Sequence, residues 1–321
     1  MKNVILIIGG DPNSINSEII YKTWIKLEKS IKKRVFLISN YTLLQKQFKK
    51  LNYSIKITKV NNINETKNVK SLKVLNLNLK FKHPFKVSKH EASNFILNSL
   101  NFGHKLALDN DVIGLVNCAI DKNLLKKNNI GVTEYLASKC NVKKNSEVML
   151  ISNSNLSISP ITTHIDLKKV SKTLNKNIIV NKINTINNWY KSYYKKKPRI
   201  CILGLNPHNG ELKENSEEKK IIIPAILKLR KKGIKAFGPE PADSIFISSY
   251  KNFDIIVGMF HDQILPPFKA LYKFNAINLT LGLKYPRVSP DHGTAKKLIN
   301  KNKANPESLI RCIKFINKLK K

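Results

Sequence analysis

The chain alternates between short apolar runs and longer segments whose apolar residues recur at helical spacing. Runs rich in β-branched residues are typical of buried strands, and helical recurrence is typical of amphipathic helices that cover a sheet. The expected strands are 4–8, 34–39, 111–120, 147–151, 156–163, 199–205 and 253–260. The expected helices are 16–27, 41–51, 90–107, 133–140, 177–196, 217–232 and 305–319. This alternation predicts an α/β fold with a mostly parallel sheet and helices on both of its faces.

Three segments depart from this alternation. Residues 52–80 are rich in Lys and Asn, and their apolar runs at 54–60 and 72–79 have no assigned partner. Pro224 predicts a kink or a break in the helix 217–232, because proline lacks the N–H that an inner helical turn needs. The segment 238–243 contains two prolines and is expected to be a rigid loop.

The size of the chain allows a substantial core. With 321 residues and 42% hydrophobic content, it can bury one large core or two ordinary ones. It has no apolar run close to the roughly 20 residues that cross a bilayer. The first apolar run ends at the turn Gly9-Gly10-Asp11-Pro12, so we interpret it as a strand and not as a signal peptide. The four cysteines lack paired spacing, which favours free buried thiols in a reducing cytoplasm.

The formal net charge of +37 would by itself predict a polyanionic partner such as nucleic acid. Only five of the 58 basic residues are arginine, however, and the lysines are spread over the whole length. A nucleic-acid-binding surface more often gathers arginines and interleaves exposed aromatic residues. The pattern therefore favours a solvated basic surface, which would also speed the capture of an anionic substrate.

Three histidines, His164, His208 and His261, each follow an apolar run that we expect to be a strand. Any one of them could be a hydrogen-bonded loop residue without a chemical role. Together they are a better candidate, because neutral imidazole is the commonest side-chain ligand of zinc and related ions. In α/β proteins, small molecules and ions bind beyond the carboxyl ends of the strands. A catalytic metal ion is typically coordinated by three side chains of the protein. These histidines are therefore candidate ligands of one catalytic divalent metal.

Basic, amide and acidic residues near the histidines are further candidates. Lys269 lies eight positions after His261, although it could equally be an ordinary surface lysine. Arg287 is notable in a chain that nearly always uses lysine, since a planar guanidinium suits a carboxylate or a phosphate. Asn278 lies between them in the chain. The nearest carboxylates, each of which could orient a histidine or take part in catalysis, are Asp243, Asp262 and Asp291.

The segment Asp291-His292-Gly293-Thr294-Ala295 is expected to open a helix. A glycine and small hydroxyl residues at a helix N-terminus suit a phosphate or a nucleotide. The Gly-x-Gly-x-x-Gly fingerprint of the ordinary dinucleotide fold does not follow the first strand.

Taken together, these motifs resemble one known family along nearly the whole chain. In order, they are Gly10-Asp11-Pro12, Thr133-Glu134-Tyr135-Leu136-Ala137, Thr162-Thr163-His164, Leu205-Asn206-Pro207-His208, Gly238-Pro239 with Pro241-Ala242-Asp243, His261-Asp262-Gln263, Asn278 through Gly282, and Asp291 through Ala295. The chain resembles the 4-hydroxythreonine-4-phosphate dehydrogenase family of pyridoxal phosphate biosynthesis.

This resemblance implies two α/β/α domains of the isocitrate/isopropylmalate dehydrogenase type, with an active site in the cleft between them. The expected first domain is 1–125 with 270–321, and the second, with the dimer contact and metal ligands, is 126–269. The resemblance also implies a homodimer whose metal site is shared across the interface. A cytoplasmic enzyme without a membrane partner is expected.

The resemblance also implies roles for individual residues. His164, His208 and His261 would bind the divalent metal (Zn, Mg or Co), and Thr133, Lys269, Asn278 and Arg287 would bind the substrate. The segment His292, Gly293, Thr294 and Ala295 would bind NAD or NADP, and Lys269, Asp243 and Asp262 are the candidate catalytic groups. The implied reaction oxidises a phosphorylated hydroxy acid to a β-keto acid, which then loses carbon dioxide.

The chain also departs from the family pattern. Val132 replaces the histidine that usually precedes the Thr-Glu-Tyr-Leu-Ala motif, which leaves room for a different substrate such as 4-phospho-erythronate or 4-phospho-threonate. The usual Pro-Ile-Asn-Lys is here Ala119-Ile120-Asp121-Lys122. The segment Ile299-Asn300-Lys301-Asn302 lacks the usual glycine, and this second change leaves NAD and NADP both open. A basic nucleic-acid-binding protein on the same scaffold is the alternative from another class.

Overall fold

The computed structural model describes residues 3–65, 70–125, 131–142, 146–247, 249–273 and 275–319 of the chain. The chain packs as two compact units, unit 1 (Met1–Cys140 and Lys284–Lys321) and unit 2 (Asn141–Leu283). The boundaries expected from the sequence, after residues 125 and 269, lie earlier in the chain. Helix α5 (Val132–Lys139) therefore belongs to unit 1 and not to the second unit.

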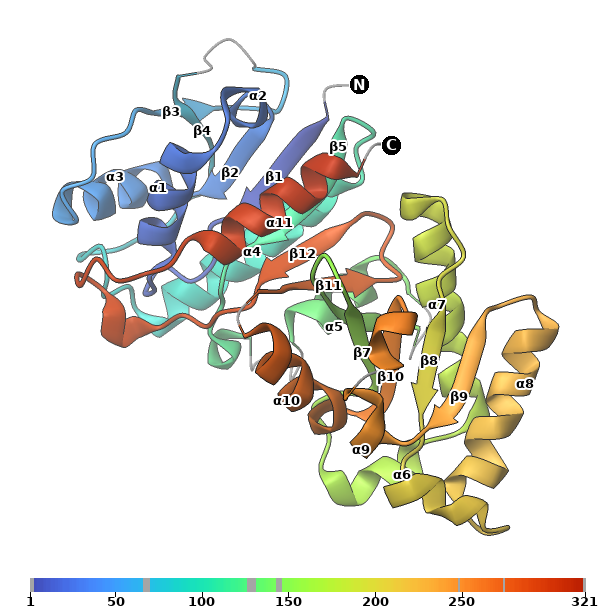
Figure 1. The fold of residues 1–321 in the computed structure, drawn as a ribbon. Coiled ribbons are helices and arrows are strands. Elements are labelled where there is room, and N and C mark those ends of the chain that lie inside the picture. The colour runs from blue at the N-terminus through green and yellow to red at the C-terminus, as the bar shows by residue number, and fades with distance from the viewer. Residues whose placement is uncertain are drawn as a thin grey trace. The chain divides into compact units, whose positions relative to one another are not determined.

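Unit 1 is built on a parallel sheet (Figure 1). Its strand order is β3-β4-β2-β1-β5-β12. The strands are β1 (Val4–Ile8), β2 (Val35–Ser39), β3 (Ile57–Val60), β4 (Leu72–Asn76), β5 (Val112–Asn117) and β12 (Arg287–Pro290). β1, β2 and β5 are buried along their whole length, as expected for apolar strands covered on both faces. The two apolar runs without an assigned partner in the sequence thus supply β3 and β4, at one edge.

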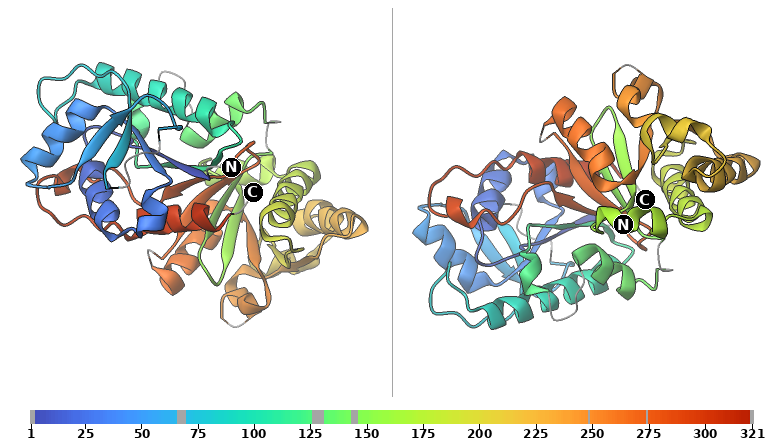
Figure 2. Two further views of the ribbon diagram at one scale, coloured as in Figure 1. Left: turned by 90° about the horizontal axis from the view of Figure 1, so that it is seen from above. Right: turned by 90° about the horizontal axis from the view of Figure 1, so that it is seen from below.

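Helices cover both faces of the unit 1 sheet. Figure 2 shows α4 (Lys89–Ala107) on one face, with α1 (Asn16–Lys26) and α11 (Glu307–Lys318) on the other. The shorter helices are α2 (Lys29–Lys32), α3 (Tyr41–Lys50) and α5. Side chains cap two of these helices: Asn40 accepts the N–H of Leu43 at the start of α3, and Ser88 accepts that of Glu91 at the start of α4.

Unit 2 has a mixed sheet with the strand order β11-β6-β7-β10-β8-β9. Its strands are β6 (Val148–Ser152), β7 (Ser157–Thr162), β8 (Ile200–Leu203), β9 (Ala236–Glu240), β10 (Ile255–Phe260) and β11 (Ile277–Leu281). β6 runs antiparallel to both of its neighbours, whereas β7, β10, β8 and β9 are parallel. The side chain of Asn153 accepts the N–H groups of Asn155 and Leu156, which closes the short turn between β6 and β7.

The helices of unit 2 also lie on both faces of its sheet. α10 (His261–Tyr272) packs on β7 and β10, and α7 (Lys176–Tyr194) lies on the opposite side with α8 (Ile223–Lys231) (Figure 2). Two short helices, α6 (Val170–Thr173) and α9 (Ala242–Ile245), complete the set. A π-helical turn, η5 (Glu218–Ile222), precedes α8 and places Pro224 in the first turn of that helix. The helical segment is therefore not broken at this proline; it changes from π-helical to α-helical directly before it.

The predicted α/β class is confirmed, and the expected strands and helices of the described residues lie near their expected bounds. Two local predictions were wrong, and one helix was not predicted. Segment 238–243 is not a loop, because it closes β9 and opens α9. Helix α10, which begins directly at His261 and contains two prolines, was not among the expected helices. Residues 291–295 do not open an α-helix, since only the 3₁₀ turn η7 (Lys296–Leu298) follows them.

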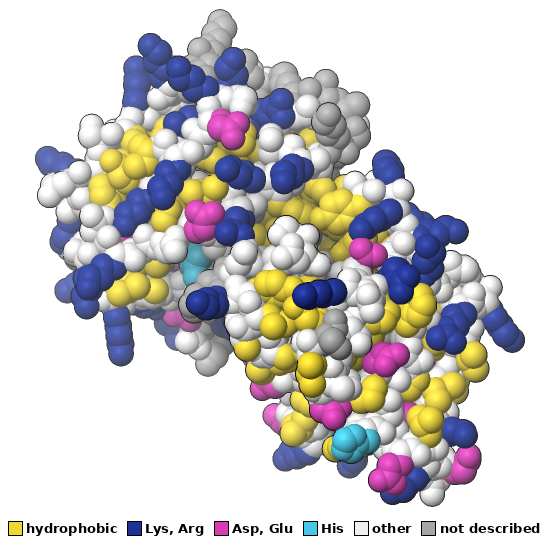
Figure 3. Space-filling model, viewed as in Figure 1, with side chains coloured by type: hydrophobic (Ala, Val, Ile, Leu, Met, Phe, Trp, Pro, Cys, Tyr) yellow, Lys and Arg dark blue, Asp and Glu magenta, His cyan; other side chains and the backbone are white. Residues whose placement is uncertain are grey.

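The cysteines and the basic side chains lie as the sequence predicts, the former buried and the latter mostly on the surface. All four cysteines are free and buried, and burial raises the pKa of Cys118 to about 12, which keeps this thiol protonated. Lys and Arg side chains are dispersed over the face shown in Figure 3. Within the part of the chain that the structure describes, no helix has the length and apolar character needed to cross a membrane.

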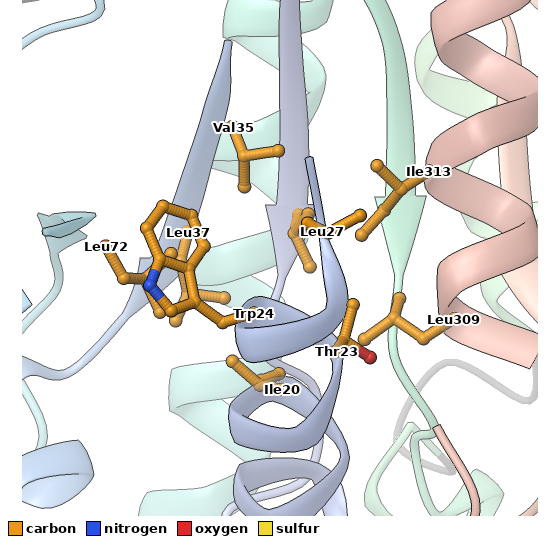
Figure 4. A pocket seen from close by; sticks show the side chains of 10 residues that line it. Ile20, Thr23, Trp24, Leu27, Val35, Leu37, Leu72, Leu309 and Ile313 are labelled. Carbon is orange, nitrogen blue, oxygen red and sulfur yellow. The ribbon is translucent and has the colours of Figure 1, made fainter. Parts of the chain in front are cut away.

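A small apolar gap lies beneath α1 in unit 1 (Figure 4). Side chains such as Ile20, Trp24 and Ile313 line it, and Thr23 places a hydroxyl among them. Because no set of polar groups converges on this gap, we interpret it as imperfect packing and not as a binding site.

Replacing Thr23 with valine is expected to stabilise the protein. Among the described residues, the buried hydroxyl of Thr23 has no hydrogen-bond partner, so its removal abolishes a desolvation cost at nearly constant volume. We expect the free energy of unfolding to rise by about 1 kcal/mol, measured by urea denaturation. Thr185→Val is the matched control and should lower stability, because that hydroxyl donates to the carbonyl oxygen of Ser146. Equal effects of the two substitutions would contradict the interpretation.

Candidate active site

The unit 2 sheet brings two of the candidate histidines together. β7 and β10 are parallel neighbours, with Thr162 paired to Phe260 at their carboxyl ends. His164 follows β7 and His261 follows β10, so both side chains emerge at the same edge of the sheet. Their ring centroids lie 5.8 Å apart with the planes inclined at 39°. This separation is compatible with two imidazoles that bind one divalent ion.

His208 lies beyond the carboxyl end of β8, which is the other parallel neighbour of β10. Its imidazole Nδ1 lies 3.7 Å from a carboxylate oxygen of Asp243, and both side chains are largely exposed. In the described ranges of this single chain, no three His, Cys, Asp or Glu side chains form a group suited to a metal ion. The chain alone therefore gathers two of the three candidate imidazoles.

Hydrogen bonds fix the strand ends that carry these histidines. The hydroxyl of Thr162 donates to the carbonyl oxygen of Met259 at 2.7 Å, which ties the end of β7 to the end of β10. Gln263 accepts the N–H of Met259 at 2.7 Å, and its amide donates to the carbonyl oxygen of Gly204 at 2.7 Å. Gln263 thus joins the end of β10 to the end of β8. These contacts hold three neighbouring strand ends in one arrangement, which is the support that a ligand set needs.

The two candidate catalytic aspartates each lie beside a histidine. A carboxylate oxygen of Asp262 lies at hydrogen-bond distance from Nδ1 of His261, at 2.6 Å, and a carboxylate in this position orients the imidazole of a metal ligand. Asp243 lies 3.7 Å from Nδ1 of His208, which is too long for a hydrogen bond. Both carboxylates are exposed, at 79% for Asp262 and 60% for Asp243. Asp291 belongs to unit 1, where its backbone N–H donates to the hydroxyl of Ser308.

The other two candidates in unit 2 lie on different elements. Lys269 is exposed on α10, the helix that begins at His261. Asn278 lies on β11, half-buried, in register with Ile151 of β6. The structure thus places Lys269 on the same helix as a candidate metal ligand, and Asn278 on a strand beside β6.

Unit 1 holds a buried guanidinium that the sequence singled out. Arg287 begins β12 and is only 4% exposed. Its Nε donates to the side-chain oxygen of Asn117 at 2.6 Å, and its Nη1 donates to the hydroxyl of Thr133 at 3.2 Å. Burial lowers the pKa of Arg287 to about 10, which leaves the group protonated at neutral pH. Asn117 and Thr133 orient the guanidinium, and the carboxylate of Glu134 also lies near enough to act on its charge.

The candidate cofactor segment follows β12 in unit 1. The backbone carbonyl oxygen of Thr294 accepts a hydrogen bond from the N–H of Ile15 at 3.2 Å. The side chain of Lys296 forms an ion pair with Asp121 at 2.7 Å. A side chain at Gly293 would meet no other atom within 4 Å, so its backbone is open to a ligand. His292 Nδ1 lies 2.9 Å from the carbonyl oxygen of Gly293. The segment is thus anchored at its end by a salt bridge, but it lacks the helix N-terminus expected to bind a phosphate.

Sequence reasoning gave no role to the residues that hold the candidates in place, although Thr162 and Gln263 lie in two of the motifs quoted for the resemblance. Asn117, Gln263 and Thr162 contact the candidate groups or their strand ends through hydrogen bonds over long chain separations. Each is an ordinary polar residue at the end of an apolar strand or just after it. For Asn117, that position is the signal that the sequence offers.

Comparison with known proteins gives one consistent result. The model of the family described as "Pyridoxal phosphate biosynthetic protein PdxA" matches residues 31–316. Two similar curated proteins are 4-hydroxythreonine-4-phosphate dehydrogenases. The one from Sulfurihydrogenibium sp. is 35% identical over 97% of this chain and 97% of its own. The one from Aquifex aeolicus is 34% identical over 99% of each chain.

Solved structures give the same result for the fold. The crystal structure of 4-hydroxythreonine-4-phosphate dehydrogenase from Klebsiella pneumoniae superposes with a TM-score of 0.88 at 27% identity, and the match covers 99% of both chains. The similarity extends over the whole chain and is not limited to a shared sheet.

Proposed function

This chain belongs to the PdxA family of pyridoxal phosphate biosynthesis and is an oxidoreductase related to the 4-hydroxythreonine-4-phosphate dehydrogenases; on that premise we propose its substrate, cofactors and residue roles. The substrate is 4-phosphooxy-L-threonine. The products are a reduced nicotinamide cofactor and a β-keto acid, which loses carbon dioxide to give 3-amino-2-oxopropyl phosphate. The reaction takes place in the cytoplasm.

The observation that carries the proposal is the pair His164 and His261 at adjacent strand ends, with ring centroids 5.8 Å apart. Neutral imidazoles suit zinc, and cobalt or magnesium are the other candidate ions. We propose that this pair binds one divalent ion together with His208 of the partner subunit in a homodimer. That assignment accounts for a chain whose described residues gather only two of the three imidazoles. An ion bound there would supply Lewis acidity, which makes the substrate's secondary hydroxyl easier to deprotonate.

The remaining residues bind and orient the substrate. Arg287 provides a fixed positive charge for the phosphate or carboxylate group, and Thr133 and Asn117 hold its plane. Lys269 and Asn278 supply further polar contacts to the substrate. Fixing both ends of a small substrate converts binding energy into alignment of the carbon that loses hydride.

Proton transfer falls to three groups of unit 2. Lys269, Asp243 and Asp262 are the candidates that could take the hydroxyl proton, and Asp262 also orients the ring of His261. The segment from His292 to Ala295 binds NAD or NADP, which accepts the hydride. The ion pair of Lys296 with Asp121 holds this segment at its end.

Val132 is the feature that favours a second substrate. It is the first residue of α5 and directly precedes Thr133, which contacts Arg287. A half-buried valine there offers no hydrogen bond to a polar substrate group. A related four-carbon acid such as 4-phospho-erythronate or 4-phospho-threonate is therefore the alternative substrate.

A substrate panel tests the proposal. Purified protein is incubated with NAD or NADP and each of the three phosphorylated acids, and reduced nicotinamide is followed by its absorbance. We expect 4-phosphooxy-L-threonine to be the best substrate and chelation to lower the rate by roughly 100-fold or more. Added zinc, cobalt or magnesium should restore it. Full activity after exhaustive chelation would exclude the metal, and no reduction with any acid, together with salt-dependent DNA binding, would favour the nucleic-acid alternative.

A further inference from the structure

A buried carboxylate in unit 2 contacts the backbone that leads into the loop of His208. Glu218 is fully buried on the π-helical turn η5. Its Oε1 accepts the backbone N–H groups of Leu205 at 2.7 Å and Asn206 at 2.8 Å, and its Oε2 accepts the side-chain amide of Asn206 at 3.0 Å. Burial would raise the pKa of Glu218, but these donors outweigh it and lower the pKa below its usual value. Glu218 is therefore a buried anion held by three N–H donors.

The loop that follows these donors has an unusual backbone. In the turn η4 (Pro207–Leu212), the φ angle is 50° at His208, 57° at Asn209, 52° at Glu211 and 53° at Leu212. Consecutive non-glycine residues in this left-handed region cost roughly 1–2 kcal/mol each. Such a turn persists only if its surroundings fix it, and strain of this kind is concentrated at functional sites.

The packing around Glu218 shows what fixes the turn. A side chain at Gly210, inside the turn, would lie 3.0 Å from Oε2 of Glu218, and one at Gly204, before it, would lie 3.1 Å from Oε1. The backbone thus approaches the carboxylate closely from both sides. Asn209 adds a second anchor, since its amide donates to the carbonyl oxygen of Pro239 at 3.0 Å. π-Helical turns such as the one that presents Glu218 are frequent at functional sites.

A glutamine would not serve in the place of Glu218. All three contacts of the carboxylate are with N–H donors, so an amide NH₂ group in either orientation would face a donor. A purely structural loop could be closed more cheaply by a neutral acceptor, because burying a charge without a cationic partner is costly. The carboxylate is thus the acceptor that matches all three donors directly before the left-handed turn.

We propose that Glu218 is a positioning residue that fixes the His208 loop so that its imidazole is presented to the metal. The inference rests on the proposed role of His208 as a metal ligand. Glu218 itself touches neither the metal nor the substrate. Its effect passes through the backbone N–H groups of Leu205 and Asn206 and through the side-chain amide of Asn206, which directly precede the loop.

The test compares metal affinity in Glu218→Gln, His208→Ala and the wild-type protein, with cobalt(II) binding followed by absorbance and by calorimetry. We expect Glu218→Gln to raise the Kd for cobalt by roughly tenfold or more. At saturating cobalt its kcat should return to within a few fold of the wild-type value, a split that general loss of structure would not produce. Glu214→Gln is the matched control and should change neither quantity, because Glu214 is 84% exposed and contacts only Lys219 among the ion pairs described.

The outcomes separate this inference from the proposed function. If His208→Ala loses metal affinity and Glu218→Gln does not, the positioning role is wrong and the ligand assignment stands. If His208→Ala binds cobalt as the wild type does, the ligand assignment itself fails. Should Glu218→Gln not fold, Asn206→Ala replaces it, because it removes the amide contact to Oε2 and keeps the backbone donors. A loss of affinity of a few fold then supports the role, and unchanged affinity overturns it.

Discussion

Replacing His208 with alanine is expected to abolish metal-dependent NAD(P) reduction, with a loss of roughly 1,000-fold or more in kcat/KM. The fold should persist, because the His208 side chain is 76% exposed and leaves no cavity when truncated. His164→Ala and His261→Ala should have the same effect on activity. Circular dichroism and thermal unfolding of the metal-free proteins would check the fold, and calorimetry would check the loss of metal.

Mixing inactive variants then tests which subunit supplies each imidazole. If His164 and His261 of one subunit share a metal with His208 of the partner subunit, a heterodimer of His164→Ala with His208→Ala retains one intact site. Random exchange between two such homodimers of twofold symmetry should restore roughly a quarter of the wild-type activity. His164→Ala mixed with His261→Ala should restore none, because these rings lie 5.8 Å apart in the same chain. Proven subunit exchange without any recovery in the first mixture would show that no site is shared in this way.

Much of this site could be predicted from the sequence because it lies at strand ends. Apolar, β-branched runs such as Ile255–Phe260 identified the strands, and polar residues directly after them identified candidate ligands. The sequence could not give the order β7-β10-β8, which is what makes His164 and His261 neighbours. Strand order depends on long-range packing, whereas strand position depends on local pattern.

Other features escaped prediction for separate physical reasons. The short connection between Ser152 and Ser157 permits only an antiparallel pair, so β6 could have been recognised as antiparallel from its loop length alone. Helix α10 was hidden by Pro266 and Pro267. The role of Glu218 depends on three contacts with a loop more than ten residues away, and a Glu-Glu pair before a helix carries no local sign of burial.

Changing Arg287 to lysine is expected to raise KM for the phosphorylated acid by roughly 10- to 100-fold, with a smaller effect on kcat. A lysine ammonium keeps the charge but cannot reproduce the fork that reaches both Asn117 and Thr133. Arg230→Lys is the matched control, because that guanidinium donates to the carbonyl oxygen of Ala236 in unit 2 and should leave KM unchanged. Initial rates over a range of substrate concentrations would measure both effects.

The variant Asn117→Asp tests whether the positive charge of Arg287 binds the substrate or only stabilises the fold. The new carboxylate would lie at the position of an oxygen now 2.6 Å from Nε of Arg287, so it would pair with the guanidinium and offset its positive charge. The new carboxylate would compete with the anionic group of the substrate for the guanidinium, so we expect KM to rise at least tenfold. The thermal unfolding midpoint should stay unchanged or increase. A purely structural role for Arg287 predicts an unchanged KM, so KM is the measurement that separates the two roles. An unaltered KM in both Arg287→Lys and Asn117→Asp would remove this guanidinium from the substrate site, and the anion would then have to be held by other basic residues such as Lys269.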